Sequence, residues 1–233
     1  MKKDEKKTAF IPDTGPSAAD LRAWINEAKE RQRNVFPRGS SAVLIPVLIR
    51  DGEYHVLYEV RSAKLHSQPG EVCFPGGRIE KGEEPLQAAM REAAEELCIG
   101  IEQIEIVGAL DETTGPGGIQ FFSFIGVLHG YEGTWSRAEV DHVFTLPLKW
   151  ILEKEPDIYK VKMVNHYPED FPFESVPGGR DYKWKARYYP VPFYQGTDPV
   201  LWGVTARVTH TLATLLKDVP DRTLQDSPAN LAQ

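Results

Sequence analysis

The sequence predicts an α/β fold, and three observations lead to this prediction. Short apolar segments rich in β-branched and aromatic residues recur along the chain at the length of strands. Two segments, residues 85–98 and 202–216, instead repeat their apolar residues every three or four positions, which is typical of amphipathic helices. Strand-like segments lie before and between these helices, so the two kinds of element are interleaved along the chain.

The composition is that of a globular protein with one catalytic domain. The chain has 233 residues, of which 41% are hydrophobic and 26% charged, and this length suffices for one substantial core. Its formal net charge of −7 argues against a surface for nucleic acid or an anionic membrane, because either would need a basic stripe. We therefore expect a small molecule, and neither nucleic acid nor membrane, as the binding partner.

The sequence also favours a cytoplasmic protein. The charged N-terminal MKKDEKK is not followed by an apolar segment, and the longest apolar run, residues 42–49, is too short to span a bilayer. The two cysteines, Cys73 and Cys98, fall in segments that we expect to be buried, and no cysteine–histidine spacing indicates a zinc site. They suggest a reducing compartment.

Changes in composition divide the chain into three parts. Residues 1–38 are predicted to form a polar arm and a helix at about 18–33, whose apolar face either packs on the domain or contacts a second copy in a homodimer. Residues 39–218 form the predicted domain, which includes an excursion at 153–189. Residues 219–233 form a polar tail that we expect to fray.

The first half of the domain begins with a predicted hairpin. Segments 41–49 and 54–60 are apolar and β-rich, and the intervening Asp51-Gly52 marks a tight turn. A loop over residues 61–70 follows, and a short strand at 71–74 then leads to Pro75-Gly76-Gly77. Glycines at this place allow a close approach between the backbone and a ligand.

The helix expected at 85–98 combines an apolar face with an acidic one. Pro85 suits its first position, and Gly100 is predicted to end it. Leu86, Met90, Ala93 and Leu97 share the apolar face, whereas Glu92, Glu95 and Glu96 share the acidic face. Like charges one turn apart cost about 0.2–0.5 kcal/mol per pair. The acidic face is therefore either an ordinary solvated surface or a site for a divalent cation such as Mg²⁺ or Mn²⁺.

The second half of the domain is predicted to add strands and a closing helix. Segments 105–110 and 120–128 are strand-like and are joined by a flexible loop at 111–118. A strand at 139–144, a short helix at 149–152, a strand at 188–194 and the helix at 202–216 follow. The aromatic residues of the excursion at 153–189 favour ordered structure with local β-strands, either beside a pocket or at a dimer surface.

The acidic helix carries the pattern of a known family. Gly77, Glu83, the pair Arg91-Glu92 and the pair Glu95-Glu96 are spaced as in the signature of the Nudix hydrolases, which this stretch closely resembles. The resemblance implies an α/β/α sandwich with a mixed sheet. One position departs, because the family usually has glycine where this chain has Cys98; we expect the nearby Gly100 to supply the helix stop instead.

The resemblance also implies how the ion is held. Glu92 and Glu96 match the usual ligands, Glu95 would be a further ligand or a proton acceptor, and the backbone oxygen of Gly76 is a ligand in some relatives. Arg91 and Glu83 are assigned to orientation, because an arginine fork can pair with Glu83 and Glu95 and fix the ligand side chains.

The general base of such enzymes varies and often lies outside the helix. Glu139, Glu112 and Asp111 are the candidates, and we rank Glu139 first because its place before a β-rich run resembles an acidic position in relatives. An ordinary surface glutamate is the alternative for Glu139.

A second motif indicates the substrate. Arg61-Ser62, His66, Gly70 and the run from Phe74 to Gly77 resemble the motif of the coenzyme A diphosphatase branch, and we expect these residues to bind substrate. That branch has arginine at the position of His66 and commonly glutamine at the position of Glu71. Histidine, unlike arginine, is only partly cationic at neutral pH. His66 is therefore either a weaker phosphate contact or a loop residue without a ligand. The stretch from Trp202 to Arg207 resembles the closing-helix motif of the same branch.

The function hypothesis is metal-dependent hydrolysis of the pyrophosphate bond in coenzyme A or acyl-coenzyme A. Its products would be 3′,5′-ADP and a 4′-phosphopantetheine. One alternative is another nucleoside diphosphate derivative, such as ADP-ribose or NADH, because the upstream motif is imperfect. The other is a non-catalytic ligand-binding module, against which the complete set of Glu92, Glu95 and Glu96 argues.

Overall fold

The structure is a computed structural model, and it describes residues 39–115 and 118–217. The N-terminal arm, the helix expected at about 18–33 and the tail at 219–233 lie outside the described residues. No helix among the described residues is long and apolar enough to cross a membrane.

The expected hairpin is present. Strand β1 (Ser41–Arg50) pairs antiparallel with β2 (Glu53–Arg61). At the turn, Asp51 and Gly52 have φ angles of 52° and 80°. Two consecutive positive φ angles are those of a two-residue type I′ turn, which Asp-Gly favours. The turn chemistry thus fixes the register of the two strands.

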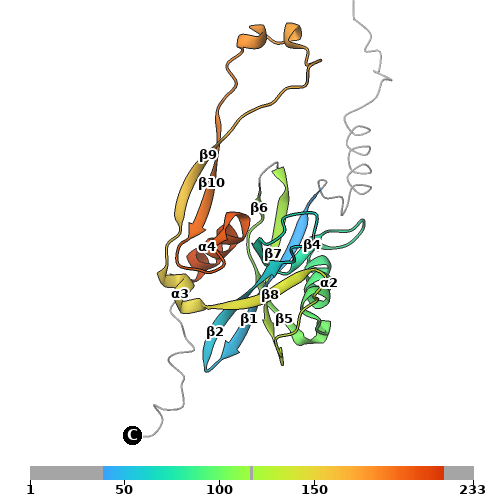
Figure 1. Cartoon of the computed structure of the whole chain (residues 1–233), viewed down its shortest axis with the longest axis vertical. Coiled ribbons are helices and arrows are strands. Elements are labelled where there is room, and N and C mark those ends of the chain that lie inside the picture. Colours follow the sequence, from blue (N-terminus) through green and yellow to red (C-terminus); the bar gives the residue numbers. More distant parts are fainter. Residues whose placement is uncertain (1–38, 116–117, 218–233) are drawn as a thin grey trace, which may run out of the picture. The chain divides into compact units, whose positions relative to one another are not determined.

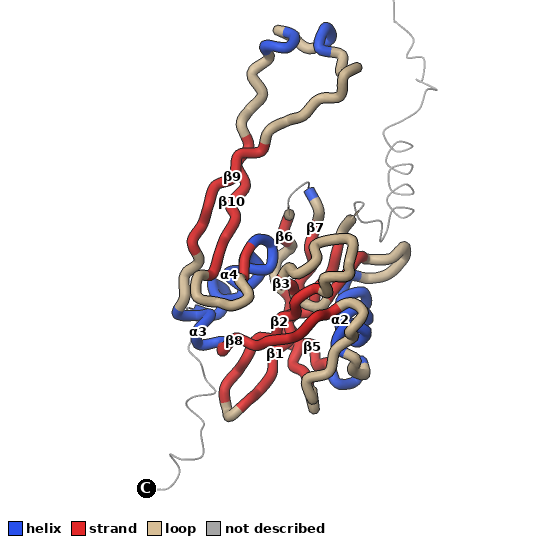
Figure 2. The backbone as a smooth tube through the Cα atoms, viewed as in Figure 1, coloured by secondary structure: helices blue, strands red, loops and turns tan. Residues whose placement is uncertain are grey.

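One mixed sheet is built around this hairpin (Figure 2). Strand β1 pairs in parallel with β7 (Gln120–Leu128), whereas its other partners, β2 and β4 (Gly76–Arg78), run antiparallel to it. The remaining strands pair antiparallel with β2 or β7. They are β3 (Val72–Cys73), β5 (Ile104–Ala109), β6 (Thr113–Thr114) and β8 (Val140–Pro147).

Helices cover both faces of this sheet, which confirms the predicted α/β/α sandwich (Figure 1). Leu44 and Leu48 of β1 join a buried cluster with Leu97 of helix α2 (Pro85–Leu97). Ile45 instead joins a cluster with Leu212 of α4 (Gly203–Lys217) and with α3 (Leu148–Glu153). Successive side chains of a strand point to opposite faces, and residues 44–48 of β1 are all apolar and buried, so this part of the strand is covered on both sides.

Helix α4 is fixed to the sheet by two polar contacts, one buried and one partly buried. The hydroxyl oxygens of Tyr58 in β2 and Thr209 lie 3.1 Å apart, and the Thr205 hydroxyl donates to the Val72 carbonyl oxygen at 2.9 Å. Burial raises the pKa of Tyr58 well above its usual value, so this hydroxyl stays protonated. The second contact holds β3, the strand that leads to Gly76.

The excursion is ordered and contains local β-structure, as its aromatic content predicted. Strand β9 (Asp157–Met163) pairs antiparallel with β10 (Arg187–Tyr194), and β11 (Leu201–Trp202) extends this second, smaller sheet. Two short 3₁₀ helices, Phe173–Ser175 and Gly179–Asp181, lie in the connection from β9 to β10 (Figure 1). The Tyr167 ring lies 4.8 Å from Phe171 and 5.7 Å from Trp184, so aromatic packing orders this connection.

The end of α2 differs from the prediction. Cys98 takes the left-handed conformation, with φ 54° and ψ 50°, and ends the helix, whereas Gly100 has φ −76° and begins the next 3₁₀ turn, η1 (Ile101–Gln103). Gly100 is therefore not the helix stop. Cys98 is also exposed rather than buried.

The left-handed backbone at Cys98 is expected to cost the protein stability. A non-glycine residue in the left-handed region costs about 1–2 kcal/mol, which glycine avoids at some cost in chain entropy. Replacing Cys98 with glycine should therefore stabilise the protein by about 0.5–1 kcal/mol and raise Tm by about 1–4 °C. Cys98→Ala is the matched control, since it removes the thiol but keeps the Cβ atom. If both variants gain the same stability, the effect comes from loss of the thiol and not from the backbone conformation.

Candidate active site

Arg91 organises the acidic face of α2. Its Nε and a terminal nitrogen donate to the two Glu83 carboxylate oxygens at 2.9 and 3.1 Å, and its other terminal nitrogen donates to Glu92 Oε1 at 2.8 Å. Glu95 Oε2 lies 3.9 Å from that same nitrogen. The bond from Arg91 lowers the pKa of Glu83 below its usual value. The expected pairing with Glu83 and Glu95 is thus present, and Arg91 also holds Glu92.

The two glycines before the helix allow the sheet and the acidic face to approach closely. Gly76 has φ 154°, and a Cβ atom there would collide with the Ala42 carbonyl oxygen and lie 2.6 Å from Val43 Cα. A Cβ atom on Gly77 would collide with the Glu92 carboxylate. With no side chain in the way, the Gly76 N–H donates to Glu96 Oε2 at 2.8 Å. The predicted ligands Gly76 and Glu96 are therefore direct neighbours.

A buried carboxylate from β2 was missed by the sequence reasoning. Glu59 is 1% exposed and Glu96 is 3% exposed. The Cys73 thiol donates to Glu59 Oε1 at 3.2 Å, while Glu59 Oε2 is buried and has no hydrogen-bond partner among the described residues. Burial raises the pKa of both carboxyls, and the charge of Glu59 raises that of Glu96 further. A glutamate between the apolar residues Tyr58 and Val60 of β2 was the signal available in the sequence.

The loop after β2 and the start of β8 meet at this cluster. The Ser62 N–H donates to the Glu139 carbonyl oxygen at 2.8 Å. A residue predicted to bind substrate, Ser62, thus lies beside the residue predicted to be the general base, Glu139. Ser62 is buried and Glu139 is exposed. After the larger effect of burial, the charge of Glu139 also contributes to the raised pKa of Glu59 and Glu96. Glu139 is therefore close enough to act electrostatically on the buried pair.

The other predicted substrate residues divide into two groups. Arg61 closes the loop at its base, since its N–H donates to the Glu71 carbonyl at 2.9 Å and its carbonyl accepts from the Gly70 N–H at 3.0 Å. His66 lies exposed in that loop. Phe74 instead lies in the core, 3% exposed and stacked 4.9 Å from Tyr58. Its ring therefore packs in the core and supports the strand.

The alternative base candidates and Arg207 lie elsewhere. Asp111 and Glu112 are exposed in the loop before β6. Arg207 donates to the carbonyl oxygens of Thr114 and Pro190 at 3.2 and 2.5 Å, and its guanidinium stacks 4.2 Å from the Tyr189 ring centre. These contacts give Arg207 a structural role between α4, β6 and β10.

The loop before β8 secures the C-terminal end of α2. The Ser136 N–H donates to the Glu96 carbonyl oxygen at 2.7 Å, and the Thr134 hydroxyl donates to the Leu97 carbonyl oxygen at 2.7 Å. Carbonyl groups of the last helical turn have no partners within the helix, so these bonds satisfy them. They also fix the backbone at Glu96, the deepest carboxylate of the face.

The chemistry of this site fits a divalent cation. As the side chains stand, no three His, Cys, Asp or Glu residues in the described part of the chain converge enough to hold one metal ion, and Glu92 is turned toward Arg91. Two adjacent buried carboxylates and the partnerless oxygen of Glu59 nevertheless require positive charge when ionised. Hard oxygen donors of this kind suit Mg²⁺ or Mn²⁺.

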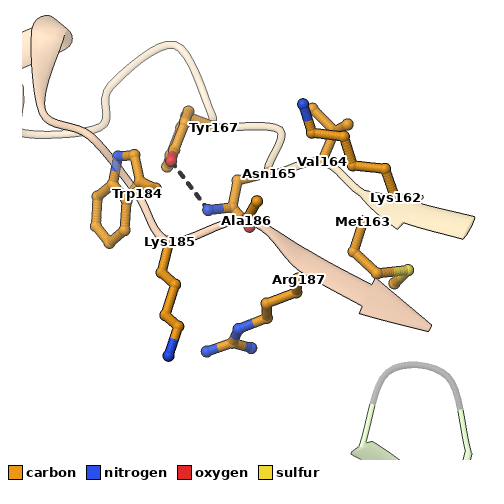
Figure 3. Close-up of a pocket in the computed structure, with 9 residues that line it drawn as sticks. All are labelled: Lys162, Met163, Val164, Asn165, Tyr167, Trp184, Lys185, Ala186 and Arg187. Carbon is orange, nitrogen blue, oxygen red and sulfur yellow. Dashed lines mark hydrogen bonds between the residues drawn. The ribbon is translucent and has the colours of Figure 1, made fainter. Parts of the chain in front are cut away.

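A separate pocket of about 240 Å³ lies where β9 and β10 meet the connection between them (Figure 3). Its lining includes the cations Lys162, Lys185 and Arg187, the rings of Tyr167 and Trp184, and Asn165. We call it the hairpin pocket. None of the residues predicted for the metal or the substrate lines it.

Comparison with known proteins adds family evidence to this geometry. Residues 40–167 match the model of the NUDIX domain. The chain is 30% identical over 215 residues to "Peroxisomal coenzyme A diphosphatase NUDT7" of Mus musculus, covering 88% of this chain and 82% of that protein. It is 31% identical over 186 residues to "Uncharacterized Nudix hydrolase NudL" of Enterobacter sp. (strain 638), covering 78% and 84% of the two chains.

A solved structure was also found by comparison. The crystal structure of RenU, a Nudix hydrolase from M. Smegmatis, is similar over 51% of this chain and 76% of that chain, with a TM-score of 0.42 and 24% identity.

Proposed function

Because the chain belongs to the NUDIX family of hydrolases, we propose that it hydrolyses the pyrophosphate bond of coenzyme A or an acyl-coenzyme A with Mg²⁺ or Mn²⁺. Nudix hydrolases are pyrophosphohydrolases that generally use divalent metals, and they act on nucleoside diphosphate derivatives. The observation that carries the choice of coenzyme A is the upstream motif from Arg61 to Gly77, supported by the name of the mouse relative.

In the proposed mechanism, the carboxylates of α2 would hold the ion. Glu92, Glu96 and Glu95 would be ligands with the Gly76 carbonyl oxygen, and Glu59 would offer its partnerless oxygen from β2. The ion supplies positive charge that offsets the charge on the diphosphate oxygens. Arg91 and Glu83 keep the acidic face in position, and Glu92 would have to turn from Arg91 to serve as a ligand.

Glu139 is proposed to accept the proton of the attacking water. Its carboxylate is exposed to solvent, and its backbone is tied to Ser62 beside the buried pair. The water oxygen bonds to one phosphorus as the bridging P–O bond breaks, and the bridging oxygen leaves on the other phosphate. The products are 3′,5′-ADP and a 4′-phosphopantetheine. Glu139→Gln with full metal-dependent activity would remove it from this role.

A panel of substrates tests the proposal. Coenzyme A, acetyl-coenzyme A, ADP-ribose, NADH and nucleoside triphosphates are incubated with the protein and Mg²⁺ or Mn²⁺, and the products are identified by mass spectrometry. Formation of 3′,5′-ADP from coenzyme A, faster than cleavage of the other compounds, is expected. Faster cleavage of ADP-ribose or NADH would favour the second candidate, to which the exposed His66 in place of arginine points.

His66 gives a second prediction within this proposal. Arginine at this position would add a permanent, fork-shaped donor for a substrate phosphate. His66→Arg should therefore lower KM for coenzyme A by about 3–10-fold and leave kcat nearly unchanged. His129→Arg, on another exposed histidine, is the control for added charge. An unchanged KM in the His66 variant would show that this residue does not touch substrate.

Two further expectations remain part of this proposal. We propose a cytoplasmic location, which the two free cysteines support and which a fluorescent fusion in cells would test. A homodimer is also proposed, and sedimentation of the full chain would test it.

A further inference from the structure

The hairpin pocket differs in charge from the rest of the chain. The protein has a net charge of −7, yet Lys162, Lys185 and Arg187 line this pocket and no carboxylate does. None of these three side chains forms an ion pair with a carboxylate in the part of the chain that the structure describes. Unneutralised positive charge gathered in a concave surface attracts anions.

Two of the cations are arranged as a pair. Lys185 and Arg187 are two positions apart as the chain enters β10, and Figure 3 shows both side chains extending to the same side of the hairpin. Arg187 lies opposite Met163 in the β9–β10 ladder, so its stem rests beside an apolar side chain and its guanidinium is directed outward. An arginine fork next to a lysine is the combination that suits a phosphate group.

An aromatic surface adjoins these cations. Trp184 is 44% exposed, although its ring is held by Tyr182 at 4.8 Å and by Tyr167 at 5.7 Å between ring centres. A large ring that is fixed by its neighbours and open to solvent can stack on a planar ligand at little cost in entropy. The Asn165 amide donates to the Tyr167 hydroxyl oxygen at 3.1 Å, which leaves its carbonyl oxygen as an acceptor.

We propose that the hairpin pocket binds a phosphorylated nucleoside. The phosphate lies at Lys185 and Arg187, and the base stacks on Trp184 beside Asn165. A volume of about 240 Å³ leaves room for no more than one small ligand, and the acidic character of the whole chain disfavours a longer nucleic acid. This site is separate from the carboxylates of α2, so the proposal does not depend on the substrate of the hydrolase.

Binding in the absence of divalent ions tests the proposal directly. The full chain is titrated in EDTA with 5′-AMP, adenosine and inorganic phosphate by calorimetry. We expect 5′-AMP to bind at least about tenfold more tightly than adenosine or phosphate alone, because it engages both the cations and the ring. If 5′-AMP binds less than about tenfold more tightly than adenosine or phosphate, the two-part site is overturned.

Charge reversal locates the binding. Lys185→Glu/Arg187→Glu should weaken 5′-AMP binding at least about tenfold, and Trp184→Leu should weaken 5′-AMP but not phosphate. Lys149→Glu/Lys154→Glu, on exposed lysines of α3 and its end, makes the same change in net charge outside the pocket and should have little effect. If the reversed variant loses its native circular dichroism, Lys185→Gln/Arg187→Gln replaces it.

Three outcomes would overturn the proposal. The first is equal 5′-AMP affinity in the pocket variants and in the α3 control. The second is loss of 5′-AMP binding in Glu92→Gln but not in the pocket variants, which would place the nucleotide at the acidic face. The third is tighter binding of an RNA oligonucleotide than of 5′-AMP, which would make the pocket part of a larger nucleic-acid surface.

Discussion

Replacing Glu96 with glutamine is expected to reduce kcat/KM for pyrophosphate hydrolysis by at least about 10³-fold, which corresponds to about 4 kcal/mol of transition-state stabilisation. Glu96 is 3% exposed, and its Oε2 accepts the Gly76 N–H at 2.8 Å. Glutamine keeps the size of the side chain but removes the charge that the ion requires. Steady-state kinetics with Mg²⁺ and with Mn²⁺ would measure the loss.

Two further measurements separate metal binding from folding in this variant. Calorimetry should show weaker Mn²⁺ binding by Glu96→Gln, while circular dichroism should remain native. Glu132→Gln, on an exposed glutamate, is the control for loss of one negative charge. Activity within about threefold of the unmodified protein would exclude Glu96 as a metal ligand.

Replacing Glu59 with glutamine is expected to stabilise the metal-free protein at neutral and alkaline pH. Burial raises the pKa of Glu59 and Glu96, so between the usual carboxyl pKa and the raised values the folded state binds more protons than the unfolded state. In EDTA the free energy of unfolding should therefore fall as pH rises from about 5 to about 8. Glu59→Gln should recover about 1–3 kcal/mol at pH 8.

Thermal unfolding at several pH values would check this result. Tm of Glu59→Gln in EDTA at pH 8 should rise by several degrees, and its decline with pH should be shallower. Glu53→Gln, at the exposed start of the same strand, is the control. Added Mn²⁺ should raise Tm less in Glu59→Gln than in the unmodified protein, because the variant has less buried negative charge for the ion to neutralise. An unchanged or lower Tm in EDTA would contradict the account of this buried pair.

The sequence was most informative for features that depend on residues close together in the chain. The apolar and acidic faces of α2 follow from residues three and four apart, and the helix observed at Pro85–Leu97 agrees with the prediction of 85–98. The β1–β2 hairpin followed from Asp51-Gly52 and its flanking apolar strands. The pairing of Arg91 with Glu83 also followed, because their spacing belongs to a known motif.

Features that depend on distant residues were not predictable in the same way. Glu59 is one of several charged or polar residues in β2, and only the packing of α2 against the sheet brings it near Glu96. Phe74 was placed in a binding motif, but its stacking on Tyr58 assigns it to the core. The left-handed Cys98 was missed because glycine usually takes that conformation and Gly100 was available nearby.

The parallel pairing of β1 with β7 bears on how the protein is made. This ladder joins residues 41–47 to residues 121–127, whereas β2, β4 and α2 all lie between them in the chain. A growing polypeptide on the ribosome therefore carries every acidic residue of α2 before it carries β7, the parallel partner of β1. Until β7 emerges, one long edge of β1 stays open, and this interval is when the nascent chain most needs protection by chaperones.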